Sequence, residues 1–406
     1  MSKTAHAAPR TLARTLAFAL VGVGLGTLLA LLLAEGICRI LPVSTGVRAL
    51  PVNASTPIFR FEPDREYVYS TAWNFSIVNR GRTNNEGFVN NQDYAASDAR
   101  PLLAVIGDSY VEALMVPYSN TLHGRLQSCV EGTGRVYSFA ASGAPLSQYL
   151  AWAEHAKSRF TPSAMAFVVV GNDFDESLAK YKSAPGFHYF RESMDGKLTL
   201  KRYDYTPSRL RKIARSSAFI RYLVLNVHFH SQLAAVWDRL IRPARANNAP
   251  AYVGNSSSST NTQRMRDSMR AIEAFFDELP RRAGLSTSRI VFIMDGIRPQ
   301  LYQGKEALNQ VRNAYFPRMR DYFIHEARQR GYPVVDLQPT FLSTHKNTGA
   351  KFEFDDDAHW NSLGHSLAAQ ALAKTTAIRD LFGVASPPKG TDFSNCIRSG
   401  TGATPR

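Results

Sequence analysis

Cysteine is scarce in this sequence, with three in 406 residues, and no segment of the chain repeats another. Neither the cysteines nor the ten histidines form a cluster with the spacing of metal ligands, so we expect no metal and no cofactor. The net charge is +15, but no DNA- or RNA-binding motif accompanies it, which argues against a nucleic-acid partner. Anionic lipid headgroups or an acidic polysaccharide fit the excess of basic residues better.

Residues 15–34 form an uninterrupted apolar run without charge or proline, long enough to cross a bilayer as one helix. Three basic residues and no acidic residue precede it: Lys3, Arg10 and Arg14. The positive-inside rule then makes residues 1–14 a cytoplasmic tail and sends the rest of the chain to the periplasmic side of the inner membrane. A cleaved signal peptide is the alternative, but residues 35–39 offer no small-x-small cleavage site.

Two of the three cysteines could form a disulfide in the part of the chain that we expect to be exported. Cys38 lies at the membrane boundary, whereas Cys129 and Cys396 both follow the apolar run. A disulfide between these two would persist outside the cytoplasm, and the alternative is two unpaired thiols.

Beyond the apolar run, the chain changes character at about residue 101. Residues 42–100 are expected to form a stalk and a subregion of short strands. Residues 101–382 are expected to form one domain in which buried strands alternate with helices. A tail over residues 383–406 follows this domain. Five short apolar runs mark the strands: 102–107, 135–140, 164–171, 289–295 and 332–337. Such alternation predicts an α/β fold, a three-layer α/β/α sandwich around a five-stranded parallel sheet.

A long insertion, residues 175–262, separates the third strand from the fourth. Its first part is basic, and residues 217–240 have helical spacing of apolar side chains, so we expect a helical insertion. Residues 187–240 are expected to flank the mouth of the site as a lid or binding element. The alternative is a solvated basic face with one extra core helix.

Residues suited to acyl transfer follow the strands at one edge of the predicted sheet. Ser109 comes just after the first strand, Gly143 after the second and Asn172 after the third, and His359 precedes the last helix. A serine nucleophile needs a base, and the base needs a carboxylate, for which Asp356 and Asp357 are the candidates. The Ser109 and Gly143 N–H groups and the Asn172 amide would supply the oxyanion donors.

Four short motifs contain these residues, around Ser109, Gly143, Asn172 and His359. Their order over residues 101–378 resembles that of the motifs of the SGNH (GDSL-like) hydrolases. The resemblance implies a flavodoxin-like sheet of order 2-1-3-4-5 and a Ser–His–Asp triad. Many esterases of the family show Asp-x-x-His, which selects Asp356, whereas its envelope O-acetyltransferases show Asp-x-His, which selects Asp357. The following Trp360-Asn361 is more similar to the second group, so Asp357 is slightly favoured.

Three functions remain open from the sequence. The first is a membrane-anchored serine hydrolase that cleaves acyl esters, in particular acetyl esters, through an acyl-serine intermediate. The second is an O-acetyltransferase that modifies an envelope or exported polysaccharide, with a multi-spanning acyltransferase as partner. The third is a non-catalytic polysaccharide-binding protein. We expect supporting roles for four neighbouring residues: Asn361 as a helix cap, His365 in the core, and Asp108 and Asp173 in bracing loops.

Overall fold

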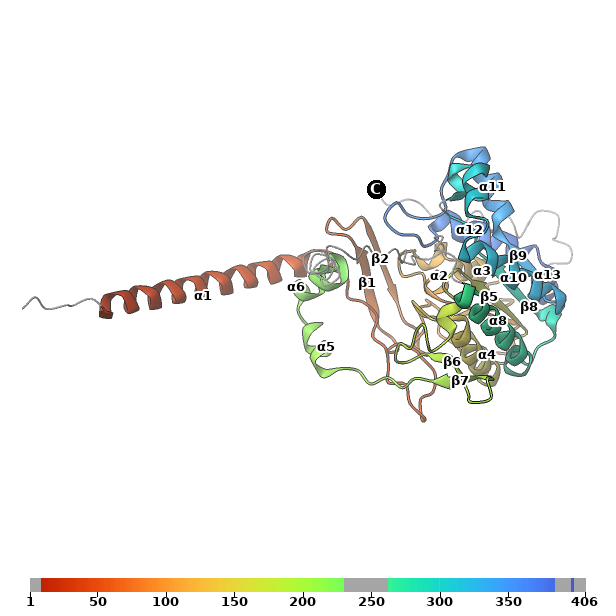
Figure 1. The fold of residues 1–406 in the computed structure, drawn as a ribbon, viewed down its shortest axis with the longest axis horizontal. Helices are drawn as coiled ribbons and strands as arrows, with labels where there is room; N and C mark the ends of the chain where they lie inside the picture. The colour runs from red at the N-terminus through yellow and green to blue at the C-terminus, as the bar shows by residue number, and fades with distance from the viewer. Residues whose placement is uncertain (1–8, 230–261, 299, 384–395, 398–406) are drawn as a thin grey trace, which may run out of the picture. The chain divides into compact units, whose positions relative to one another are not determined.

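A computed structural model of the chain describes residues 9–229, 262–298, 300–383 and 396–397. Its main sheet has five parallel strands in the order β4-β3-β5-β8-β9, which in chain order is 2-1-3-4-5. Figure 1 labels three of these strands, β5, β8 and β9. The strands are β3 (Leu102–Gly107), β4 (Arg135–Ala140), β5 (Ala164–Val169), β8 (Ile290–Met294) and β9 (Val334–Asp336). The predicted strands and their order are therefore confirmed.

Every residue of β3, β4, β5 and β8 is buried, because helices cover both faces of the sheet. One layer contains α4 (Leu146–Phe160), α8 (Thr262–Ala283) and α10 (Tyr315–Gln329). The other contains α3 (Leu122–Cys129), α12 (Ser362–Ala373) and α13 (Thr376–Leu381), joined by α11 (Leu337–Thr348). Successive strand residues point to opposite layers: Val291 belongs to the core under α12, and Phe292 packs on Phe275 of α8.

Two helical stretches of the domain are each divided into two helices. Residues 305–330 form α9 (Lys305–Val311) and α10, and Pro317 explains the break. Proline lacks an N–H and is best tolerated in the first turn of a helix, and α10 begins two residues before Pro317. The last stretch is divided in the same way, because α12 ends at Ala373 and Thr375 is the N-cap of α13.

Of the two alternatives that the sequence left open for Cys129 and Cys396, the structure shows the disulfide. Cys129, at the end of α3, is bonded to Cys396, with 5.8 Å between the Cα atoms. Ile397 is fully buried in the same core as α12, and its carbonyl oxygen accepts a hydrogen bond of 3.0 Å from Arg125 Nη1. The bond therefore fastens a segment near the C-terminus onto the face of α3.

The N-terminal apolar run is helical, as predicted, within α1 (Pro9–Ile40). Residues Arg14–Ile40 are long and apolar enough to cross a membrane, and the side chains of residues 14–33 are all exposed, whereas Cys38 near the end of the helix is buried. Length and composition alone do not separate an anchor from a signal sequence.

Apart from α1, the described elements outside the sandwich are short. The pair β1 (Glu66–Thr71) and β2 (Ile77–Arg82) lies in the region expected to contain strands. The insertion contains an antiparallel hairpin of β6 (His188–Glu192) and β7 (Leu198–Arg202), which the sequence did not predict. It continues with α5 (Arg209–Ala214), α6 (Ala218–Arg221) and a π-helical turn, Tyr222–Asn226. The part of the helix predicted over 217–240 that follows residue 229 lies outside the described residues.

The chain forms two compact units. Met1–Gly46, Val68–Val78 and Ser208–Leu240 make up the first, and Val47–Tyr67, Asn79–Pro207 and Ile241–Arg406 the second. The insertion is divided between them, so its expected place at the mouth of the site stays a prediction, as do the predicted domain boundaries.

Candidate active site

Ser109 lies where β3 passes into α2 (Ser109–Glu112), at the carboxyl edge of the sheet. The Asp108 side chain accepts a hydrogen bond of 2.9 Å from the Tyr110 N–H and so caps this short helix. Gly107 is required by space, because a Cβ there would lie 2.5 Å from Val111 Cγ2. The turn therefore holds the Ser109 hydroxyl at the edge where ligands bind in parallel sheets.

His359 contacts Ser109 across 250 positions of sequence. The distance from His359 Nε2 to Ser109 Oγ is 2.7 Å, which is within hydrogen-bonding range. The other ring nitrogen, Nδ1, is hydrogen bonded to Asp357 Oδ1, which also accepts from the His359 backbone N–H at 3.0 Å. Asp356, the alternative carboxylate, is exposed. With a proton on Nδ1, the Nε2 lone pair is directed at the serine hydroxyl, which is the arrangement a general base needs.

The electrostatics around the imidazole favour its protonated form. Burial alone would lower the pKa of His359, but the hydrogen bond and charge of Asp357, with Asp108 and Glu112 farther away, raise this pKa above its usual value. The histidine is therefore prepared to hold the proton that it takes from Ser109.

Glu112 is a buried carboxyl group that the sequence analysis missed. Its Oε2 accepts hydrogen bonds from the backbone N–H of Ser142, at 2.9 Å, and from the Ser142 hydroxyl. Burial raises the pKa of Glu112 to about 7, although the bonds from Ser142 lower it. Burial also raises the pKa of Asp108, to about 6. Glu112 thus ties α2 to the loop that carries Gly143.

Gly143 and Asn172, the expected oxyanion donors, are linked through Lys182 and Glu176. Gly143 has a φ of +76°, which favours glycine, and its carbonyl oxygen accepts a hydrogen bond of 2.8 Å from Lys182 Nζ. Asn172 Nδ2 donates to Glu176 Oε2 at 3.3 Å, and the same oxygen also binds Lys182. An amide carries two N–H bonds, and Glu176 takes one of them. The oxyanion role of the two residues stays a prediction.

Arg298 is a second buried group that the sequence did not reveal. Its side chain is only 3% exposed. Its guanidinium donates to four oxygens: Asp295 Oδ2 at 2.7 Å, Tyr110 OH at 3.0 Å, Glu353 Oε2 at 2.5 Å and the Ala358 carbonyl at 3.1 Å. The last two belong to the loop that carries His359. A single buried cation therefore holds this loop against the end of β8 and α2.

The four supporting residues have structural contacts, as expected. Asn361 caps α12 by accepting from the N–H groups of Leu363 and Gly364 at 3.0 and 3.1 Å. His365 is buried, and its Nδ1 accepts from the Leu122 N–H. Burial lowers the pKa of His365, which fits a neutral core residue. Asp108 caps α2, and Asp173 accepts from the Val170 N–H and the Tyr149 hydroxyl.

Comparison with solved structures gives only distant likenesses. The structure named "Crystal Structure of TesA" is 14% identical, with 69% of this chain and 99% of that chain covered and a TM-score of 0.34. A member of the lipolytic protein G-D-S-L family from Veillonella parvula is 11% identical, with 68% and 97% covered and a TM-score of 0.33. A lipase/acylhydrolase from Enterococcus faecalis is 8% identical, with 71% and 98% covered and a TM-score of 0.33.

No curated protein matches the sequence. Residues 252–391 match the family model described as "SGNH hydrolase-like domain, acetyltransferase AlgX". The matched segment contains Asp357 and His359, while Ser109, Gly143 and Asn172 precede it. Over residues 252–391 the chain is therefore similar to the SGNH hydrolase-like acetyltransferase family, and its serine and histidine are in contact at the carboxyl edge of a 2-1-3-4-5 sheet.

Proposed function

We propose that this protein cleaves acyl esters, in particular acetyl esters, through an intermediate in which the acyl group is bound to Ser109. The match of residues 252–391 to a family model described as an SGNH hydrolase-like acetyltransferase domain supports an acyl esterase or acyltransferase activity. The observation that carries the finer proposal is the chain of contacts from Ser109 Oγ through the His359 ring to Asp357.

The reaction begins when His359 Nε2 takes the Ser109 hydroxyl proton while Oγ forms a bond to the ester carbonyl carbon. Asp357 stabilises the resulting imidazolium through Nδ1–H, and the Ser109 and Gly143 N–H groups and the Asn172 amide receive the oxyanion. His359 then gives the proton to the leaving alcohol oxygen as the C–O bond breaks. In the second half, His359 Nε2 removes a proton from water or from a sugar hydroxyl while that oxygen bonds to the acyl carbon. The bond from this carbon to Ser109 Oγ then breaks, and His359 returns the proton to Oγ.

Transfer to a polysaccharide hydroxyl is the second candidate, because the matched family model is described as an acetyltransferase. It uses the same first half-reaction and differs only in the acceptor. A multi-spanning membrane acyltransferase that supplies the acyl group is the partner we propose for this case. A non-catalytic polysaccharide-binding protein, by contrast, has no need of a serine, histidine and aspartate in contact.

We further propose that α1 anchors the protein in the inner membrane with the catalytic domain on the periplasmic side. The basic residues before the apolar run and the Cys129–Cys396 bond, which suits an oxidising compartment, support this topology. A reporter enzyme fused after Arg406 should be active only outside the cytoplasm; activity only inside would contradict the proposal.

Intact-protein mass spectrometry tests the chemistry. The full chain in detergent is mixed with an activated acetyl ester, and we expect a transient acetyl adduct that Ser109→Ala lacks. Ser158→Ala, which removes an exposed hydroxyl from α4, is the matched control and should keep the adduct. Adding candidate glycans then separates the two functions: free acetate indicates hydrolysis, and acetylated glycan indicates transfer. An equal adduct in Ser109→Ala would refute the proposal.

A further inference from the structure

The segment 209–226, formed by α5, α6 and the π-helical turn, is both basic and apolar on its exposed surface. We call it the basic platform. No acidic residue occurs between Tyr205 and Phe229. The cations of the platform are Arg209, Arg211, Lys212, Arg215 and Arg221. Its apolar side chains are not all covered: Leu210 is 79% exposed and Ile213 is 69% exposed. Large apolar side chains exposed beside cations are typical of helices that lie in a membrane interface.

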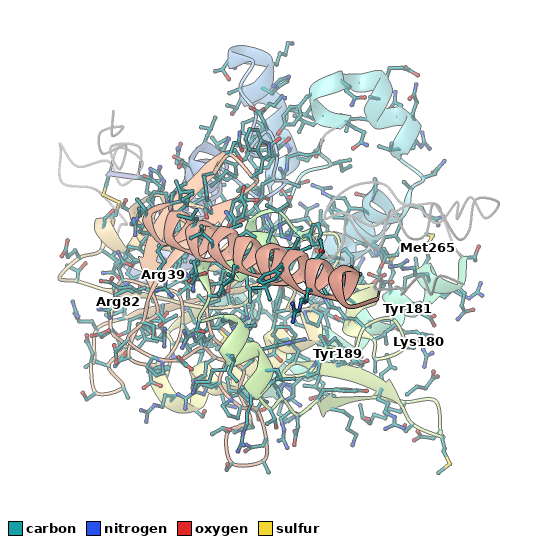
Figure 2. The ribbon with its side chains drawn as sticks, turned by 90° about the vertical axis from the view of Figure 1, so that its left-hand side faces the viewer. Arg39, Arg82, Lys180, Tyr181, Tyr189 and Met265 are labelled. Atoms are coloured by element: carbon teal, nitrogen blue, oxygen red, sulfur yellow. A yellow bond between two sulfur atoms is a disulfide. The ribbon has the colours of Figure 1, made fainter. Side chains whose placement is uncertain are left out.

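The platform is attached directly to the end of the apolar helix. Glu35 of α1 accepts a hydrogen bond of 2.7 Å from the Ser217 hydroxyl and bonds of 3.0 and 2.9 Å from the N–H groups of Ala218 and Phe219. Glu35 also forms an ion pair with Arg39, which Figure 2 labels near the end of α1. The first turn of α6 is therefore held by a residue of α1 itself.

The position of Glu35 sets the depth of the platform. It is the first residue after the apolar run 15–34, and twenty helical residues extend for about 30 Å, the thickness of the hydrocarbon core. If α1 spans the membrane, Glu35 and the start of α6 lie at the level of the lipid headgroups. Arg221 Nη1 donates to the Arg215 carbonyl at 2.8 Å, which joins the end of α5 to α6 at the same level.

A cavity of about 400 Å³ lies on the platform, lined by Arg211, Arg215 and Arg221 together with Ile220, Val224 and Leu225. Guanidinium groups bind phosphate with paired hydrogen bonds, and the aliphatic side chains suit the upper part of an acyl chain. We propose that the basic platform binds the surface of the bilayer that α1 crosses, with Leu210 and Ile213 inserted at the headgroup boundary and the arginines on anionic phospholipids. This inference rests on the proposed membrane span of α1.

Depth-dependent fluorescence quenching in nanodiscs tests the proposal with the full chain. Single cysteines replace Leu210 in the platform, Leu20 in the apolar run and the fully exposed Met194, in a Cys38→Ala background, and each carries a fluorophore. We expect a nitroxide-bearing lipid to quench the label at 20 in every disc, and the label at 210 more strongly in discs that contain phosphatidylglycerol than in neutral discs. The label at 194 should remain accessible to iodide.

A charge-removal variant identifies the interaction. Replacing Arg209, Arg211, Lys212 and Arg215 by glutamine should reduce lipid quenching at 210 in anionic discs to its value in neutral discs and leave quenching at 20 unchanged. Quenching at 20 without quenching at 210 would overturn the platform alone, and so would equal quenching at 210 in neutral and anionic discs. Absence of quenching at 20 would overturn the membrane span and this inference with it. Protection of position 210 from iodide by an added acidic polysaccharide, but not by anionic lipid, would assign the platform to a different partner and refute the proposal.

Discussion

Arg298 Nη1 donates a hydrogen bond of 3.1 Å to the carbonyl oxygen of Ala358, the residue that precedes His359. A buried cation from the end of β8 thus determines where the backbone places the candidate base. The same guanidinium also binds Tyr110, the residue after Ser109, so the nucleophile and the base share one support.

We expect Arg298→Lys to lower kcat by about 100-fold, because an ammonium cannot make the same set of bonds and a small displacement of a catalytic group has an effect of this size. The KM should change little, since no substrate contact is removed. Steady-state hydrolysis of an activated acetyl ester measures both. Arg330→Lys, at a partly exposed i,i+4 ion pair with Glu326, is the matched control and should leave kcat unchanged. An unchanged kcat in Arg298→Lys would show that the loop does not depend on this cation.

The two adjacent aspartates should differ sharply. Asp357→Asn allows the His359 ring to adopt the wrong tautomer and should lower kcat by about 10⁴-fold, the loss found when a triad aspartate is replaced in this way. Asp356→Asn, at an exposed side chain one residue away, should stay within about twofold of the wild type. The same assay compares them, and equal losses would rule out Asp357 as the specific partner of the ring.

Activity should fall as the pH is lowered through the pKa of His359. The base must be neutral to accept the Ser109 proton, and the pKa of His359 is raised by Asp357. The acidic limb of kcat/KM should therefore lie above the usual histidine value of about 6.5. Asp357→Asn removes the charge that raises the pKa of His359. The acidic limb of the kcat/KM profile, measured on the residual activity, should therefore move to lower pH. A limb that does not move would mean that another group controls it.

Glu112 should make the fold less stable at alkaline pH. The folded protein raises the pKa of Glu112 from 4.5 to about 7, so it holds this proton more tightly than the unfolded chain does. The free energy of unfolding should then fall as the pH rises from about 4.5 through about 7, by up to roughly 3 kcal/mol from this group. Glu112→Gln keeps an acceptor for Ser142 and removes this dependence. Urea unfolding measures the free energy of unfolding at about pH 5 and about pH 8. Relative to the wild type, the variant should be more stable at the higher pH than at the lower one. The same change with pH in both proteins would contradict the raised pKa of Glu112.

Breaking the disulfide should destabilise the catalytic domain. Cys129 and Cys396 are 267 positions apart, and loss of a native bond typically lowers the free energy of unfolding by about 2–5 kcal/mol. We expect Cys396→Ser to lower the melting temperature and to make it insensitive to dithiothreitol. Cys38→Ala, at the free cysteine, should keep the response to dithiothreitol. A wild-type protein that melts identically with and without reductant would argue against the bond.

The features predicted from the sequence are those that a short segment determines by itself. The sheet strands were found because each is a brief apolar run, and Ser109 and His359 because the ends of parallel strands meet at one edge. The choice between Asp356 and Asp357 needed coordinates, since neighbouring residues point in different directions.

Arg298 and Glu112 were missed for a different reason. In the sequence, each is an ordinary charged residue near the end of an element, and charged residues there are usually solvated. Only the packing of distant segments shows that both are buried, each against a loop of the candidate site. The β6–β7 hairpin was missed because its strands have five residues each within a basic stretch.

The burial of Ile397 has a consequence for the order of events during synthesis. This side chain completes a core that begins with β3, almost three hundred residues earlier in the chain. Until residue 397 has left the ribosome, its place in this core is unfilled and Cys129 cannot form its disulfide. The core between α3 and α12 can therefore be completed only after the whole domain has been synthesised, and a chaperone or a thiol oxidase would meet the chain while Cys129 is still a thiol.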